Sequence, residues 1–143
     1  MPLTIRDARL EDSASIAALL GQLGYPTHAE AVAARVERLV AAADRLVVAE
    51  VDGEVVGLAD VHVSPSLEHD RPAAKLAALV VDERHRGAGI GRALVAAMEA
   101  EARARGCAVL FLTTAERRAD AHAFYERVGL VYTGRRYAKT LVY

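Results

Sequence analysis

Apolar residues recur along the chain at two kinds of spacing, which predict where helices and strands lie. Spacings of three and four residues predict helices over 12–20, 27–42, 90–105 and 119–128. Short, largely apolar runs predict strands over 2–6, 46–51, 54–63, 75–81 and 109–113, with two more strands within 130–143. The order is β-α-α-β-β-β-α-β-α-β-β. It predicts an α/β fold of the α+β kind, with about four helices and a mixed, mostly antiparallel twisted sheet of six to seven strands.

A few residues mark the boundaries of these elements. Asp52-Gly53 is typical of a two-residue hairpin, so the strands on either side of it are expected to pair antiparallel. Thr27 and Glu30 have the spacing of a capping box, which predicts the start of the second helix. Gly21, Gly24 and Pro26 are expected to break the first helix, and Gly106 and Gly129 to end the third and fourth helices. The run 75–81 is apolar on both faces, and 109–113 follows it through a helix as a second buried, parallel strand.

Length and composition favour a single globular domain over residues 1–143. The chain is 53% hydrophobic and has a formal net charge of −1, which argues against a general nucleic-acid binder. Its N-terminus lacks a basic and apolar leader and no apolar run is long enough for a membrane span, so a soluble cytoplasmic protein is expected. The basic residues are 16 Arg and 2 Lys, a bias typical of GC-rich genomes, although some of these arginines are expected to bind phosphate.

Cysteine and histidine offer little chemistry of their own in this sequence. Cys107 is the single cysteine, so no internal disulfide forms, and its position at the start of a strand predicts a buried, inert thiol. The five histidines lack the spacing of metal ligands, and we therefore expect no metal.

The most informative segment is Arg84-His85-Arg86-Gly87-Ala88-Gly89-Ile90-Gly91-Arg92, which joins a predicted strand to a predicted helix. Glycines let a ligand approach the backbone, and the amides that begin a helix bind anions. Arg84, Arg86 and Arg92 add positive charge around the turn. A glycine-rich turn needed only for packing is the plainer alternative, but the combination is typical of a pyrophosphate cradle.

Three kinds of cradle have different sequence requirements. A dinucleotide fingerprint begun at Gly87 requires glycine at position 92, where the chain has Arg92. A nucleotide triphosphate loop requires Gly-Lys followed by Ser or Thr, and no lysine follows here. The segment does contain Arg86-x-x-Gly89-x-Gly91, the third pattern.

This third pattern resembles the Arg/Gln-x-x-Gly-x-Gly/Ala motif of the GNAT superfamily, the acyl-CoA-dependent N-acyltransferases. A second segment, Ala121 to Leu130, is similar to the family's Ala-x-x-x-Tyr-x-x-x-Gly-Phe motif, with Leu130 in place of the aromatic residue. The resemblance covers nearly the whole chain. It implies transfer of an acetyl group from acetyl-CoA to a primary amine, by direct attack in a ternary complex.

The resemblance assigns the cofactor-binding residues. Backbone groups of Leu79, Val80 and Val81 would pair with the pantetheine arm of CoA. The pyrophosphate would lie on the cradle residues Arg86, Gly87, Ala88, Gly89, Ile90, Gly91 and Arg92. Arg84 either reaches a CoA phosphate or is a solvated charge. Arg118 occupies the position where many members have an asparagine that contacts CoA, so its role is an open question.

Two catalytic roles follow from the resemblance. Tyr125 would protonate the departing CoA thiolate, and a phenol remains protonated at neutral pH. The amine must be neutral to attack a thioester, and a base would assist it. The strand before the cradle has Lys75 as its single ionisable residue, so the base must come from elsewhere. His62 is the first choice because histidine titrates near neutrality, and the other candidates are Asp60, Glu68, His69 and Asp70.

The acceptor would be a small-molecule or peptide amine, bound by residues 23–26, 60–70 and 135–137. Small family members are often homodimers, and pairing of two copies through the apolar Leu141-Val142-Tyr143 is a hypothesis by that analogy. Two other functions stay open. The chain could be an acyl-CoA-binding sensor or interaction module without chemistry, or a nucleotide-binding regulator. Binding without turnover would indicate the sensor, and stabilisation by ATP or NAD would indicate the regulator.

Overall fold

The structure is a computed structural model that describes residues 2–113, 119–134 and 136–142. It divides into two compact units, residues 1–111 and 112–143. The first unit contains β1 (Leu3–Asp7), the 3-10 turn η1 (Leu10–Asp12), α1 (Ser13–Leu23), α2 (Ala29–Ala41), β2 (Arg45–Val51), β3 (Glu54–Ser64), β4 (Ala73–Val81), the 3-10 turn η2 (Glu83–His85), α3 (Ile90–Ala104) and β5 (Val109–Phe111). The second unit contains α4 (Ala119–Arg127). The prediction of a single domain over the whole chain stays a prediction.

The sheet of the first unit has five strands in the order β1-β2-β3-β4-β5. The first three neighbouring pairs are antiparallel and β4–β5 is parallel, which confirms the predicted mixed, mostly antiparallel sheet. Asp52 and Gly53 have φ values of 52° and 79°, as a tight hairpin with two left-handed residues requires. The predicted hairpin is therefore confirmed.

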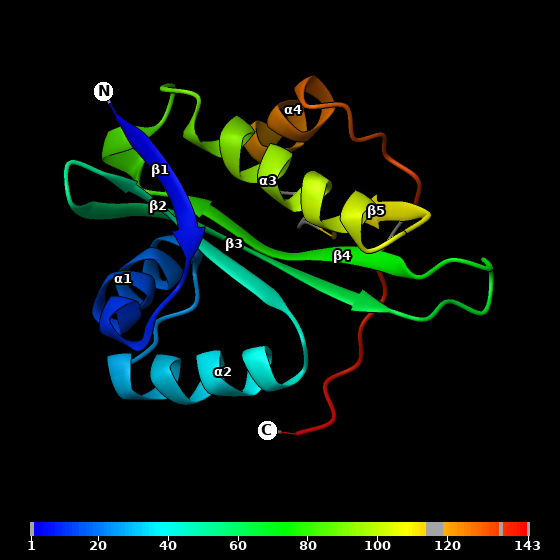
Figure 1. Cartoon of the computed structure of the whole chain (residues 1–143), viewed down its shortest axis with the longest axis horizontal. Coiled ribbons are helices and arrows are strands. Elements are labelled where there is room, and N and C mark those ends of the chain that lie inside the picture. Colours follow the sequence, from blue (N-terminus) through cyan, green and yellow to red (C-terminus); the bar gives the residue numbers. More distant parts are fainter. Residues whose placement is uncertain (1, 114–118, 135, 143) are drawn as a thin grey trace. The chain divides into compact units, whose positions relative to one another are not determined.

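Helices cover both faces of this sheet (Figure 1). On one face, α1 and α2 pack Ile16, Leu19, Val32 and Val36 against Leu58 and Val80 of the strands. On the other face lies α3, and its Ile90 and Leu94 sit close to Gly57 of β3. Both Ile90 and Leu94 are almost completely buried. Burial of the apolar side of α3 against the sheet therefore holds the start of this helix beside the middle of β3.

The expected count of six to seven strands is wrong, because the sheet has five strands within residues 2–113, 119–134 and 136–142. Residues 130–134 and 136–142 form no strand. Their apolar side chains, among them Val131, Tyr132, Leu141 and Val142, are exposed, so no buried face fixes a register there. Among the described strands β5 therefore lies at the edge, and its Val109 and Phe111 are each 40% exposed rather than buried.

Three smaller expectations are also wrong. The α2 capping box is absent because the Thr27 hydroxyl donates to the Tyr25 carbonyl at 2.7 Å, and the helix begins after His28. Helix α1 continues through Gly21, the first of its three expected breakers, and ends at the second, Gly24, whose φ is 104°. Cys107 is half-buried because it lies in the turn that ends α3, where its amide donates to the Ala102 carbonyl.

The second unit contains the predicted helix stop. Helix α4 ends at Gly129, which has a φ of 95°. The Leu130 amide donates to the Tyr125 carbonyl at 2.9 Å, and the Gly129 amide donates to the Glu126 carbonyl at 3.1 Å. This pair of hydrogen bonds is the Schellman arrangement that a left-handed residue allows. In the described part of the chain, no helix is both long enough and apolar enough to cross a bilayer.

Candidate functional site

Strand β4 separates from β5 part-way along its length. Strand β5 pairs with Ala73, Ala74 and Lys75 and with no later residue of β4. The register between β3 and β4 shifts by one just beyond this point, which makes Ala77 a bulge residue. A bulge bends its strand and increases the local twist. Within the described residues, the edge of β4 after Lys75 therefore has no partner strand.

Backbone alternation decides which groups face this open edge. The Asp82 amide donates to the Val56 carbonyl of β3 at 2.8 Å, so Asp82 and, two residues earlier, Val80 direct their backbone groups toward β3. Leu79 and Val81 lie between these positions and direct their N–H and C=O groups the other way. Three residues were expected to meet pantetheine. Two of them, Leu79 and Val81, therefore have backbone groups that face the open edge.

The chain then enters the glycine-rich turn and begins α3. Gly87 and Gly89 both have a φ of 82°, and a Cβ at either position would meet no other atom within 4 Å. The first hydrogen bond of the helix joins the Ala93 amide to the Gly89 carbonyl at 3.0 Å. No side chain caps the helix, and its N-cap residue is Gly89 itself. The amides of Ile90, Gly91 and Arg92 accordingly precede the helical ladder and are available to an anion.

The three arginines of the cradle do not behave alike. Arg86 Nε donates to the Val81 carbonyl at 3.3 Å, which ties the turn to the end of β4. Arg86 and Arg92 are exposed, and no carboxylate of the described chain forms an ion pair with them. Arg84, in contrast, contacts Asp82 at 3.0 Å and Glu54 at 3.3 Å. Arg86 and Arg92 are therefore better placed than Arg84 to meet a phosphate.

Asp82 organises the turn that leads into the cradle. Its carboxylate accepts hydrogen bonds from the Arg84 side chain and amide, which lower its pKa to about 2. Gln22 of α1 donates to the same carboxylate at 3.4 Å and accepts from the Glu83 amide at 2.9 Å. The end of α1 is thereby tied to η2. Neither Gln22 nor Asp82 carries a motif in the sequence that would have revealed this connection.

A second group of polar side chains lies on β3 and just before β2. His62 Nδ1 is 2.5 Å from an oxygen of Asp44, whose side chain is 2% exposed. Asp60, two residues before His62, is buried, and its Oδ1 has no hydrogen-bond partner. Burial and a hydrogen bond with Asp44 raise the pKa of Asp60 to about 8. Asp44 was not among the residues expected at the site.

The remaining expected residues are placed as follows. Glu68, His69 and Asp70 are exposed on the loop between β3 and β4. Tyr125 lies on α4 in the second unit, where its ring meets Phe124 edge-on at a centroid distance of 5.7 Å. Arg118 and Arg135 lie outside the described residues. The role of Tyr125 stays a prediction that rests on its motif.

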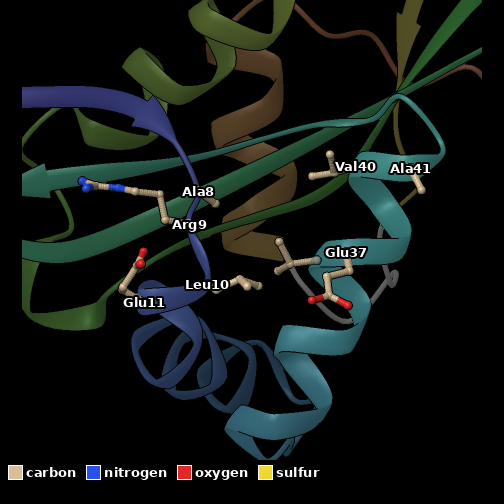
Figure 2. A pocket seen from close by; sticks show the side chains of 8 residues that line it. Ala8, Arg9, Leu10, Glu11, Glu37, Val40 and Ala41 are labelled. Carbon is tan, nitrogen blue, oxygen red and sulfur yellow. The ribbon is translucent and has the colours of Figure 1, made fainter.

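A separate hollow of about 580 Å³ lies between the segment after β1 and helix α2 (Figure 2). Its walls include Arg9 and Leu10 on one side and Glu37 and Val40 on the other, with Glu11 at one end. Two glutamates against one arginine make it unfavourable for the phosphates of CoA. None of the segments expected to shape the acceptor site lines it.

Comparison with known proteins gives one family match. The model of the acetyltransferase (GNAT) family matches residues 14–130. Aminoalkylphosphonate N-acetyltransferase of Salmonella typhimurium is 39% identical over 90 residues, which cover 63% of this chain and 58% of that protein. Glucosamine 6-phosphate N-acetyltransferase of Trypanosoma brucei brucei is 32% identical over 78 residues, which cover 54% and 51%. The matches thus span little more than half the length of these relatives.

The fold has solved counterparts. The crystal structure of a Trypanosoma brucei acetyltransferase superimposes with a TM-score of 0.83 at 27% identity, covering 98% of this chain and 100% of that one.

Proposed function

The chain belongs to the acetyltransferase (GNAT) family, and we propose that it moves an acetyl group from acetyl-CoA to a primary amine in a ternary complex. The observation that carries this proposal is the open edge of β4 leading directly into an uncapped, glycine-lined start of α3. The first feature suits an extended amide-bearing arm, and the second suits a pyrophosphate.

Acetyl-CoA would be held along this line. The backbone groups of Leu79 and the Val81 amide would pair with the pantetheine amides, since the Val81 carbonyl already accepts from Arg86. The pyrophosphate would accept hydrogen bonds from the first amides of α3 and ion pairs from Arg86 and Arg92. Val80 would contribute by packing, because its side chain belongs to the core shared with α1 and α2.

The reaction requires three proton transfers. The acceptor ammonium must lose one proton to become a nucleophile, and His62 is the proposed base. The amine then attacks the thioester carbonyl carbon, its nitrogen loses a second proton, the C–S bond breaks, and the thiolate takes a proton from a nearby acid. Tyr125 is the proposed acid, on the strength of its motif alone.

The acceptor class can be narrowed by the relatives. The names of the two curated relatives specify an aminoalkylphosphonate and glucosamine 6-phosphate. Both molecules carry a primary amine and a phosphorus oxyanion. We propose amines of this kind as the first acceptors to test, followed by polyamines, amino acids, aminoglycosides and peptide amines.

A binding experiment tests the cradle, with a matched control on the same helix. Gly89 and Gly106 lie at opposite ends of α3, have φ values of 82° and 73°, and have open space around them. Alanine at either position costs about 1–2 kcal/mol of backbone strain. Only Gly89→Ala is expected to reduce the thermal stabilisation by acetyl-CoA. Equal loss in both variants, or no stabilisation of the wild type, would contradict the proposed binding site.

Turnover is measured as release of the CoA thiol across the amine panel. Tyr125→Phe is expected to lower kcat about 10²-fold with little change in acetyl-CoA affinity. An unchanged rate would remove Tyr125 from the mechanism. Stabilisation by acetyl-CoA without turnover on any amine would instead favour the sensor.

A further inference from the structure

We propose that Asp44, Asp60 and His62 form one proton-accepting unit for the acceptor amine, with the imidazole as its outer end. This inference deepens the proposed function and rests on it. We call these three residues the acid–imidazole cluster. His62 would be the base that touches the amine, whereas Asp44 and Asp60 would be positioning residues that act through it.

The exposed fractions of the His62 and Asp44 side chains show which end of the cluster faces solvent. The His62 side chain is 45% exposed and that of Asp44 is 2% exposed, with 2.5 Å between Nδ1 and the carboxylate oxygen. An ionised carboxylate can only accept a hydrogen bond, so it holds the proton of His62 on Nδ1. The Nε2 lone pair is then left to accept a proton. A buried carboxylate behind the ring also stabilises the imidazolium that forms.

The backbone before β2 fixes Asp44 in this position. Ala43, two residues after the end of helix α2, has a φ of 65°, a left-handed conformation that is uncommon for alanine. The Asp44 amide donates to the Leu39 carbonyl at 3.0 Å, and Arg105 donates to the Ala43 carbonyl at 2.9 Å. The pairing of Arg45 with Val61 continues by one residue to place Asp44 opposite His62. Three constraints from different elements thus orient one carboxylate.

Asp60 is buried with an unpaired carboxylate oxygen, and a purely structural role for this residue does not explain that feature. It is 4% exposed, and its Oδ1 makes no hydrogen bond in the described structure. A buried oxygen without a partner costs stability. Two adjacent carboxylates do not both ionise easily, so the Asp44–Asp60 pair retains a proton near neutral pH. That proton leaves Asp44 as the one negative charge behind the imidazole.

Charged groups on the neighbouring elements include Glu30, Arg35, Glu37 and Arg38 of helix α2. Lys75 of β4 lies opposite His62 in the ladder. Arg105 reaches the carbonyl next to Asp44. Helix α1, which packs on β3 from the same side as Leu58, contains no charged residue. Within the described residues, the ion pair that His62 forms is the one with Asp44.

The proton balance of the reaction closes with this assignment. The acceptor ammonium gives one proton to His62 Nε2 and becomes a neutral amine. Its nitrogen forms the new bond to the acetyl carbon and loses a second proton, while the thiolate leaves with the C–S electron pair and is protonated to CoA. The proton on His62 passes to solvent. Each cycle releases one net proton, and Asp44 and Asp60 are unchanged.

The test compares kcat and kcat/KM across pH in four variants, two of which have matched controls. His62→Gln is expected to lower kcat about 10²-fold and to leave stabilisation by acetyl-CoA intact. His28→Gln, at an exposed histidine before α2, is the control. Asp44→Asn is expected to move the acid limb of the kcat/KM profile to lower pH, because the imidazolium loses its counter-charge. Asp52→Asn, in the β2–β3 hairpin, is its control.

Asp60→Asn tests the inner end of the cluster, since an amide keeps the shape but holds no titratable proton. Any change of rate with pH near the pKa of Asp60, about 8, is expected to disappear. Asp44→Glu is expected to restore part of the rate that Asp44→Asn loses. A merely structural role would lower the melting temperature of these variants and leave the pH limbs where they were.

The possible results separate this inference from the proposed function. Wild-type turnover with an unaffected His62→Gln variant overturns the inference and leaves the proposed function standing. Absence of turnover on every amine overturns both. NMR titration of the His62 ring needs no turnover. An imidazole pKa that is the same in wild type and Asp44→Asn overturns the cluster directly, and a lower pKa in the variant supports it.

Discussion

Gly57 of β3 lies close to the start of α3, so we predict that a methyl group added at Gly57 displaces the cradle residues that begin this helix. A Cβ at Gly57 would lie 3.1 Å from Leu94 Cδ1, 3.2 Å from the Val80 carbonyl oxygen and 3.4 Å from Ile90 Cγ2. The carbonyl belongs to the β3–β4 ladder and does not move easily. The two side chains are fully buried, so we expect the start of α3 to shift outward by a few tenths of an ångström.

Overpacking of this kind typically costs about 1–3 kcal/mol. In a chain of this size each kcal/mol lowers the melting temperature by about 3–4 °C, so Gly57→Ala is expected to melt roughly 3–12 °C below wild type. Because Ile90 begins α3, the cradle amides shift with it. We expect acetyl-CoA affinity to fall about tenfold, equivalent to about 1.4 kcal/mol of binding free energy.

Differential scanning calorimetry and titration calorimetry measure both effects. Gly21→Ala is the matched control, because Gly21 lies within α1 with no neighbouring atom near its would-be Cβ. It is expected to stabilise the protein by about 0.5–1 kcal/mol and to leave acetyl-CoA affinity unchanged. Leu94→Ala combined with Gly57→Ala should cost less than the two changes added together, because the new methyl group partly fills the cavity. A Gly57→Ala protein with wild-type melting and affinity would refute the coupling.

Three further predictions concern strain and titration. Ala43→Gly relieves a left-handed alanine (φ 65°) and should stabilise the protein by about 1 kcal/mol, measured by denaturant unfolding; a loss of stability would show that Ala43 is not strained. Asp82 has a pKa lowered from 3.8 to about 2, so its contribution to stability is present above about pH 4 and is lost as the pH falls toward 2. In melting curves across this range, Asp82→Asn should differ most from wild type above pH 4 and least near pH 2, and a constant difference would contradict the assignment. Asp60 has a pKa raised from 3.8 to about 8, so the wild type should lose stability as the pH rises from about 4 to about 8. Asp60→Asn removes this loss, and its melting temperature relative to wild type should be higher at pH 8 than at pH 4; the opposite trend would mean that Asp60 is ionised in the native state.

Sequence patterns predicted the elements whose signals are local. The hairpin at Asp52-Gly53, the glycine-rich turn before α3 and the stop at Gly129 all depend on residues adjacent in the chain, and all three are present. The predicted strands after Leu130 failed because an exposed alternation does not by itself provide a pairing partner. Strand β5 was expected to be buried for the same reason, since burial on both sides requires a further strand that the described residues lack.

The proposed base shows why part of the site was beyond sequence reasoning. His62 was selected for its chemistry, but its partner Asp44 depends on the register between β2 and β3. Continuing the pairing of Val51 with Glu54 without interruption would place Asp44 opposite Val61, on the other face of the sheet. The structure instead shifts the register by one residue between Ala49 and Glu50, and this brings Asp44 opposite His62. One extra residue in β3 therefore decides whether His62 contacts the buried carboxylate of Asp44. No turn signal in the sequence marks this extra residue.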